Sequence, residues 1–255
     1  MLHIRALLMF ESTLPFGEPE LMRASTFQRY LDELVNSGGR QIQASRLSSL
    51  SPSLLQDLMR FEQHGRQSEL LEVVAASMRH AQALCIHLQY DDKVVPLTLF
   101  PNERLAHCPV PMAEFLQSRL VDLVVMQVEP AVLRPPGDAV KELVADPALY
   151  HPLTPVTWEL AMRGRREELL PEIAGLAAYR VAPSIDPSQL PVSGPVLNAV
   201  RRLRRHTTNL REISDWPGFN RGRGMRLLNA LYLQAGLIVS RTHPVAMHDS
   251  WFSGR

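Results

Sequence analysis

Arginine is the residue whose number and spacing most clearly suggest chemistry in this chain. Between residues 200 and 226 there are eight arginines but only two acidic residues, Glu212 and Asp215. The eight are Arg201, Arg202, Arg204, Arg205, Arg211, Arg221, Arg223 and Arg226. A guanidinium group binds carboxylate or phosphate through paired N–H donors, and several phosphate contacts give salt-sensitive binding. Three interpretations stay open: solvent-exposed helix faces, contact with a protein or an acidic ligand, and contact with nucleic acid.

The other reactive residues form no recognisable catalytic or metal-binding motif. Cys108 directly follows His107, but adjacent residues of a strand point to opposite faces, so we expect an ordinary core cysteine. The nine histidines show no spacing with cysteine or carboxylate that is typical of a metal site. Asp91-Asp92 is typical of a turn, and RGRG at 221–224 lacks the lysine and the preceding strand of a phosphate-binding loop. The sequence therefore predicts no catalytic residue, no metal and no cofactor.

A helix over residues 221–235 must position the last arginines of the cluster. Because successive helical residues are rotated by about 100°, their spacing predicts which side chains face the core. The predicted core side comprises Leu228, Leu231, Tyr232 and Ala235. The predicted outward side comprises Arg223, Arg226, Asn229, Ala230 and Leu233. An outward leucine is better explained by a second packing surface, against either the N-terminal domain or another protein, than by DNA. The candidate residues for contact with a partner or a nucleic acid are Arg223, Arg226, Asn229, Leu233, Arg201 and Arg205.

The elements around this helix follow a recognisable order. A helix over 195–205 precedes NLREISDW, where Asn209 can cap a short helix and Glu212 stands three positions later, as in a capping box. Helix 221–235 follows, and a strand begins after Gly236. The most informative positions are Leu210, Ile213, Leu227, Leu228, Leu231, Gly236, Leu237 and Ile238. With these residues the segment resembles the winged-helix family, in particular its degenerate members found as tails on bacterial regulatory proteins. The resemblance implies that helix 221–235 is the recognition helix.

The first 150 residues, for which we recognise no family, alternate between expected strands and helices. Apolar and polar residues alternate over 1–10, which predicts a strand. ALCIHLQYDDKVVPLTLF predicts a β-hairpin that turns at Asp91-Asp92. Pro96 in its second strand cannot donate to a ladder, which predicts a sheet edge or an irregularity there. Helices are expected over 20–36, 51–65, 68–81 and 111–120, and a buried strand over 121–128.

Proline-rich stretches suggest where the chain divides. The best candidate boundary is 129–138, and a weaker one is 146–155. A helix is expected over 155–170 and a short strand over 177–181. We therefore predict an α/β (α+β) N-terminal domain with a small mixed sheet, followed by a mostly helical, winged-helix-like C-terminal domain. The predicted bounds are 1–136 for the first domain, 137–194 for a helical connector, 195–245 for the second domain and 246–255 for a tail.

Composition limits the class of protein. The 255 residues have a net charge of +1, so attraction to nucleic acid would have to come from a local patch. Two cysteines, no signal-peptide pattern and no apolar run of membrane-spanning length favour a cytoplasmic protein without a membrane partner. Our leading hypothesis is a non-enzymatic bacterial regulatory or adaptor protein that binds another protein. The alternatives are a DNA-binding regulator, an enzyme with a dispersed site in the N-terminal half, and self-association as a homo-oligomer.

Overall fold

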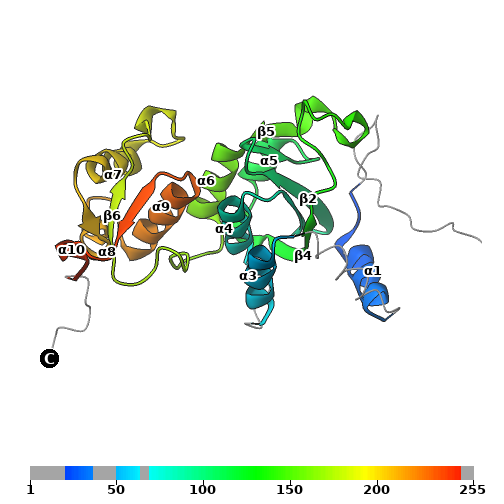
Figure 1. Cartoon of the computed structure of the whole chain (residues 1–255), viewed down its shortest axis with the longest axis horizontal. Coiled ribbons are helices and arrows are strands. Elements are labelled where there is room, and N and C mark those ends of the chain that lie inside the picture. The colour runs from blue at the N-terminus through cyan, green and yellow to red at the C-terminus, as the bar shows by residue number, and fades with distance from the viewer. Residues whose placement is uncertain (1–20, 37–49, 64–68, 248–255) are drawn as a thin grey trace, which may run out of the picture.

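The computed structural model describes residues 21–36, 50–63 and 69–247 (Figure 1). Within them the chain is a mixed α/β structure with two antiparallel sheets that lie side by side along the long axis. The strand predicted at 1–10 lies outside the described residues. No helix in the described segments is long and apolar enough to cross a lipid bilayer.

The larger sheet has five strands in the order β4-β1-β2-β3-β5. They are β1 (Leu84–Tyr90), β2 (Lys93–Phe100), β3 (Leu105–His107), β4 (Val124–Pro130) and β5 (Tyr150–Pro152). All four pairings are antiparallel, which corrects the prediction of a mixed sheet. The physical reason is the connections: β1, β2 and β3 are joined by short turns, whereas a parallel pair needs a crossover of a dozen or more residues.

The predicted hairpin is confirmed as β1 and β2. Its two-residue turn places Asp91 at a φ of 52°, a left-handed conformation that aspartate tolerates. β2 is a central strand of the sheet, whereas Pro96 was expected to lie in an edge strand or at an irregularity. However, β3 pairs only with Thr98 to Phe100, so the ladder on that side stops before it reaches Pro96. The missing N–H of proline therefore breaks no bond to β3.

One face of this sheet forms an apolar core with neighbouring helices. Leu84, Ile86 and Leu88 alternate along β1 and are completely buried. They belong to one apolar cluster with Leu71 and Val74 of the neighbouring helix α4 (Leu70–His80). The helices are α1 (Ala24–Asn36), α3 (Pro52–Gln63), α4 (Leu70–His80) and α5 (Met112–Gln117), at the predicted places. The strand predicted as buried over 121–128 is β4, an edge strand in which only Val125 is buried.

The predicted connector 137–194 contributes a strand to each sheet. β5 pairs with β3, so the larger sheet extends beyond the boundary placed at residue 136. Helix α6 (Leu153–Arg163) follows directly and ends at Gly164, not at residue 170 as predicted. Helical spacing could not show this end, because the chain turns away to bring Arg166 into contact with Glu69 and Glu72 of the α4 region.

The smaller sheet has the order β7-β6-β8. Its strands are β6 (Ala178–Val181), β7 (Thr208–Asn209) and β8 (Leu237–Ser240). The accompanying helices are α7 (Gly194–Arg205), α8 (Leu210–Ser214), α9 (Arg221–Leu233) and α10 (Pro244–Met247). These elements confirm the predicted helices and strands of this region. The Asn209 side chain caps α8 by accepting a 2.9 Å hydrogen bond from the Glu212 N–H.

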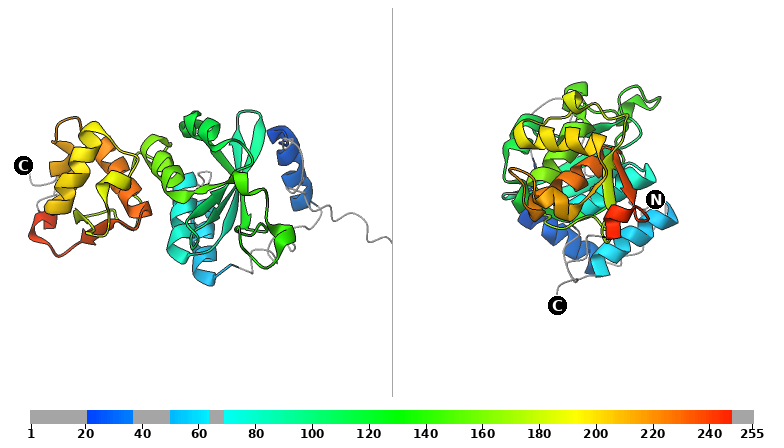
Figure 2. Two further views of the ribbon diagram at one scale, coloured as in Figure 1. Left: turned by 90° about the horizontal axis from the view of Figure 1, so that it is seen from above. Right: turned by 90° about the vertical axis from the view of Figure 1, so that its left-hand side faces the viewer.

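Helix α9 lies at the centre of this half of the molecule. It packs against α8 on one side and against α6 on the other. Figure 2 shows α6 between the larger sheet and the group of α7, α8 and α9. The same helix α6 also contacts α4 and β3. As a result, α9 is covered from two directions.

Candidate functional site

Four residues of α7 form a polar face on a helix whose other face is buried. Asn198, Arg201, Arg202 and Arg205 follow the i, i+3, i+4, i+7 spacing, which places them on one side of the helix. The apolar side repeats the same spacing with Val196, Ala199, Val200 and Leu203, all of which are buried. Because α7 is anchored through its apolar side, its arginine side is presented outward in a fixed orientation.

These arginines line a cavity of about 750 Å³ between α7 and α8, which we call the arginine pocket. Its lining includes Arg201, Arg202, Arg205, His206, Glu212 and Trp216. Trp216 is 8% exposed, and the Arg202 guanidinium lies 4.6 Å from the centre of its ring system. Such a cation–π contact holds the guanidinium flat and leaves its N–H edge able to donate.

The arginine pocket carries an excess of positive charge. Arg201, Arg202 and Arg205 form no ion pair with any other residue in the described part of the chain. Its one carboxylate, Glu212, accepts a hydrogen bond from the Thr208 hydroxyl. Three guanidinium groups against one carboxylate suit an anionic group such as a carboxylate or a phosphate.

The predicted outward face of α9 is wrong for three of its members. Asn229 and Ala230 are completely buried, and Leu233 is only 2% exposed. Of the predicted core residues, Leu228 and Leu231 are buried as expected and Tyr232 is half-buried. Ala235 is exposed, because the helix ends at Leu233, before this residue. Spacing within one helix identifies the face toward α8, but it cannot show that α6 covers the opposite face.

Asn229 has a structural role in place of the predicted contact with a partner. Its Oδ1 accepts a 2.9 Å hydrogen bond from the Leu170 N–H, and its Nδ2 donates to the Glu168 carbonyl at 2.9 Å. The amide therefore satisfies two backbone groups of the segment that follows α6. Its polar atoms face protein backbone and are not available to a base edge.

The other two predicted contact residues on α9, Arg223 and Arg226, contact groups of the same chain. Arg223 donates to the Gly218 carbonyl at 2.6 Å and lies over the Phe219 ring at 5.3 Å. Arg226 lies 3.7 Å from the Glu167 carboxylate.

Of the six candidate contact residues, only Arg201 and Arg205 lie together in the arginine pocket. Arg202 and Trp216, which complete it, were not singled out. The i, i+4 step from Asn198 to Arg202 is the signal that would have identified Arg202.

His107 and Cys108 do not form a nucleophile and base. Cys108 is completely buried, and burial raises the pKa of its thiol to about 11. Neither ring nitrogen of His107 has a hydrogen-bond partner among the described residues. The prediction of an ordinary core cysteine is confirmed.

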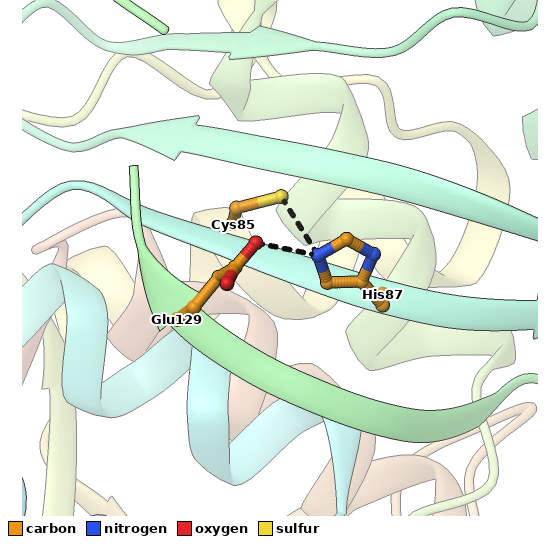
Figure 3. Close-up of side chains that lie close together, drawn as sticks. All are labelled: Cys85, His87 and Glu129. Carbon is orange, nitrogen blue, oxygen red and sulfur yellow. Dashed lines mark hydrogen bonds and ion pairs between the residues drawn. The ribbon is translucent and has the colours of Figure 1, made fainter. Parts of the chain in front are cut away.

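A second polar cluster, which the sequence analysis missed, contains Cys85, His87 and Glu129 (Figure 3). Glu129 Oε1 lies 2.8 Å from His87 Nε2, and Cys85 Sγ lies 3.7 Å from the same nitrogen. Burial lowers the pKa of His87, but hydrogen bonds with Cys85 and Glu129 outweigh it and raise the pKa to about 10. These three side chains carry the donor types that could hold a metal ion. The signal available in the sequence was C-x-H on one strand, which places two donors on one face.

Comparison of the chain with protein-family models, with curated protein sequences and with solved structures finds no match.

Proposed function

We propose that this chain is a non-enzymatic regulatory or adaptor protein that binds an acidic segment of another protein in the arginine pocket. The observation that carries the proposal is the set of three arginines that line one pocket together with Trp216 and form no ion pair with other described residues. A glutamate or aspartate side chain of a partner would supply the missing carboxylates. Bidentate pairing with arginine gives such a contact both strength and direction.

The order of elements supports a degenerate winged-helix module within this protein. Helices α7, α8 and α9 follow one another, β7 lies between the first two, and β8 follows the third. A winged helix has a hairpin wing after its third helix. Here the centre of the small sheet is β6, which precedes α7 in the chain. We propose that this module evolved away from DNA reading, with bacterial regulatory proteins as its relatives.

A protein partner fits the geometry better than duplex DNA. In a helix-turn-helix the recognition helix enters the major groove with its outer side chains free. Asn229, the best base-reading candidate, bonds to Glu168 and Leu170, and Leu233 is buried. The arginines of the pocket surround one cavity beside a tryptophan, an arrangement suited to single acidic side chains. Both cysteines are unpaired thiols, in keeping with the cytoplasmic location that we propose.

The test measures binding of two labelled probes to the full-length protein. One is a fluorescein-labelled peptide of alternating glutamate and alanine, and the other is a random duplex DNA, each titrated at two salt concentrations. We expect the peptide to bind and the duplex to bind more weakly. The double variant Arg201→Glu/Arg205→Glu should weaken peptide binding at least about tenfold, because it replaces two attractive contacts with two repulsive ones.

The matched control is Arg211→Glu, an exposed residue outside the arginine pocket that undergoes the same change of charge. It should leave peptide affinity within about twofold of the parent, since surface charges away from a site contribute little. Equal loss in the control variant would mean that overall charge, and not the pocket, attracts the peptide. Tighter binding of the duplex, with a steep salt dependence and the same loss in the double variant, would favour DNA binding and overturn the proposal.

A further inference from the structure

The three side chains of the second polar cluster come together because of strand alternation and register. Cys85 and His87 are two positions apart on β1, so they project from the same face of the sheet. Glu129 on β4 stands directly opposite Cys85 in the antiparallel ladder. The register between β1 and β4 shifts immediately after His87, between His87 and Leu88. Such a bulge changes the direction of nearby side chains and is common next to functional sites.

An arrangement of cysteine, histidine and glutamate also occurs in nucleophilic catalysis, but the geometry here differs. In a catalytic triad, the nucleophile contacts one ring nitrogen and the acid orients the imidazole through the other. Figure 3 shows both dashed lines meeting at a single nitrogen of His87. That nitrogen is Nε2, and it faces the thiol and the carboxylate together. Nε2 cannot accept the proton of the Cys85 thiol while the same nitrogen is hydrogen-bonded to the Glu129 carboxylate.

Convergence on one point is the geometry of metal chelation. The sulfur, nitrogen and oxygen donor atoms all lie within 4.8 Å of one another. Around a tetrahedral zinc ion with ordinary bond lengths, donor atoms are separated by about 3.4–3.6 Å. The separation of 3.7 Å between Cys85 Sγ and His87 Nε2 is close to that value. Glu129 Oε1, at 2.8 Å from Nε2, would have to withdraw by about half an ångström to admit the ion.

We propose that Cys85, His87 and Glu129 bind a divalent transition-metal ion, with zinc as the preferred ion. Thiolate and imidazole donors select zinc over magnesium or calcium, which prefer oxygen. The charges also balance, because a thiolate, a carboxylate and a neutral imidazole around a 2+ ion have no net charge. Neutrality matters because the side chains of His87 and Glu129 are only 15% and 21% exposed. Metal ligands must be deprotonated, so binding releases the thiol proton and any proton on His87.

The surroundings fix the donors in place. The ring of Phe27, on α1, stacks on the His87 ring with 5.0 Å between centroids and 22° between planes. Phe27 is itself only 4% exposed, so it restricts rotation of the imidazole. Three protein donors leave a fourth tetrahedral position for a water molecule. This site lies on the larger sheet, and the inference is independent of the arginine pocket.

The test titrates chelator-treated, full-length protein with Zn²⁺ alone, in competition with a chromogenic chelator, and then with Co²⁺. We expect one equivalent of metal per chain and a thiolate-to-cobalt charge-transfer band in the near ultraviolet. Loss of an outer-shell partner costs about 10–100-fold in metal affinity, so Cys85→Ser or His87→Gln should cost at least about 100-fold. Both variants should lose the thiolate band or shift it strongly, whereas Glu129→Gln should keep the band with weakened affinity.

Cys108→Ser provides the matched control, because it removes the other thiol of the chain from a buried position outside the cluster. This control should bind Zn²⁺ with the affinity of the parent. Circular dichroism of each variant before titration establishes whether it is folded. If Cys85→Ser or His87→Gln fails to fold, Glu129→Gln still tests the proposal, because glutamine has the same shape as glutamate. Absence of one-equivalent binding, or parent-like affinity in Glu129→Gln and in the folded variants of the other two ligands, would overturn the proposal.

Discussion

At the scale of single residues, His107 is a buried imidazole without a polar partner in the described part of the chain. It is 2% exposed and meets the Tyr150 ring edge-on, with 5.1 Å between centroids. Burial, with a smaller effect of the His151 charge, lowers the pKa of His107 to about 4. The folded state therefore favours the neutral ring, whereas the unfolded chain protonates near 6.5. The stability that depends on neutral His107 is complete above about pH 6.5 and is lost as the pH falls toward 4.

This pKa difference predicts a loss of about 3 kcal/mol in the free energy of unfolding between pH 7 and pH 4. Urea unfolding of the parent and of His107→Phe at both pH values measures it. The variant keeps the ring and removes the titrating group, so it should lose less stability on acidification. His206→Gln changes an exposed histidine and should retain the pH dependence of the parent. Equal pH dependence in His107→Phe and the parent would contradict the prediction.

Residue types alone predicted only part of the candidate sites. The arginine cluster was evident, because eight like charges in a short segment are visible without a fold. Glu129 could not be assigned to Cys85 and His87, because the pairing depends on the register of β4, which lies far along the chain. The Asn229 amide is hydrogen-bonded to the Leu170 N–H and the Glu168 carbonyl, which belong to an irregular segment. That segment has no periodic pattern, so its contact with α9 could not be predicted from the sequence.

At the scale of elements, α9 has two buried faces. Its length and its face toward α8 were predicted from helical spacing, since one amphipathic period has a single apolar direction. Ala230 and Leu233 were predicted to face outward because they lie opposite that direction. A small and an apolar residue on the second face are what contact with α6 requires. An outward-seeming leucine in a helix can therefore indicate a second internal contact as well as a docking surface.

Leu233→Asp should therefore unfold the protein and not merely abolish a contact with a partner. Removing a buried leucine side chain costs about 2–5 kcal/mol, and an unpaired buried carboxylate adds to this cost. Thermal unfolding followed by circular dichroism should show a large fall in Tm or no cooperative transition. Arg211→Asp, an exposed change on the neighbouring helix α8, should keep a Tm near that of the parent. A folded Leu233→Asp variant with the Tm of the parent would mean that this face is free in solution.

At the scale of the whole molecule, ion pairs connect the α4 region, which packs on the larger sheet, to the segment between α6 and β6. Arg166 donates to Glu72 at 2.7 Å and also pairs with Glu69, while its side chain is 9% exposed. Arg79, on α4, pairs with Glu172 and lies 2.6 Å from Asp57. The pairs of Arg166 with Glu69 and Glu72 and of Arg79 with Glu172 join residues almost a hundred positions apart, and no local pattern in the sequence predicts them.

Arg166→Leu should lower the free energy of unfolding by about 3 kcal/mol, because it leaves the Glu69 and Glu72 carboxylates without their cation. Urea unfolding followed by tryptophan fluorescence measures the change. Arg165→Leu alters the exposed neighbouring residue and should have an effect below about 0.5 kcal/mol. Adding Glu69→Gln to Arg166→Leu should recover part of the loss. A double variant less stable than Arg166→Leu alone would contradict an electrostatic cause.

The position of β6 has a consequence for synthesis of the chain on the ribosome. β6 is the central strand of the smaller sheet, yet it is made before both of its neighbours, β7 and β8. At translation rates of about 5–20 residues per second, β8 emerges several seconds after β6. Both edges of β6 lack their final partners until β7 emerges, and the edge that pairs with β8 stays open for the rest of the interval, so the nascent chain exposes a strand that other chains could pair with. We expect this half of the protein to complete its fold only after residue 240 has left the exit tunnel.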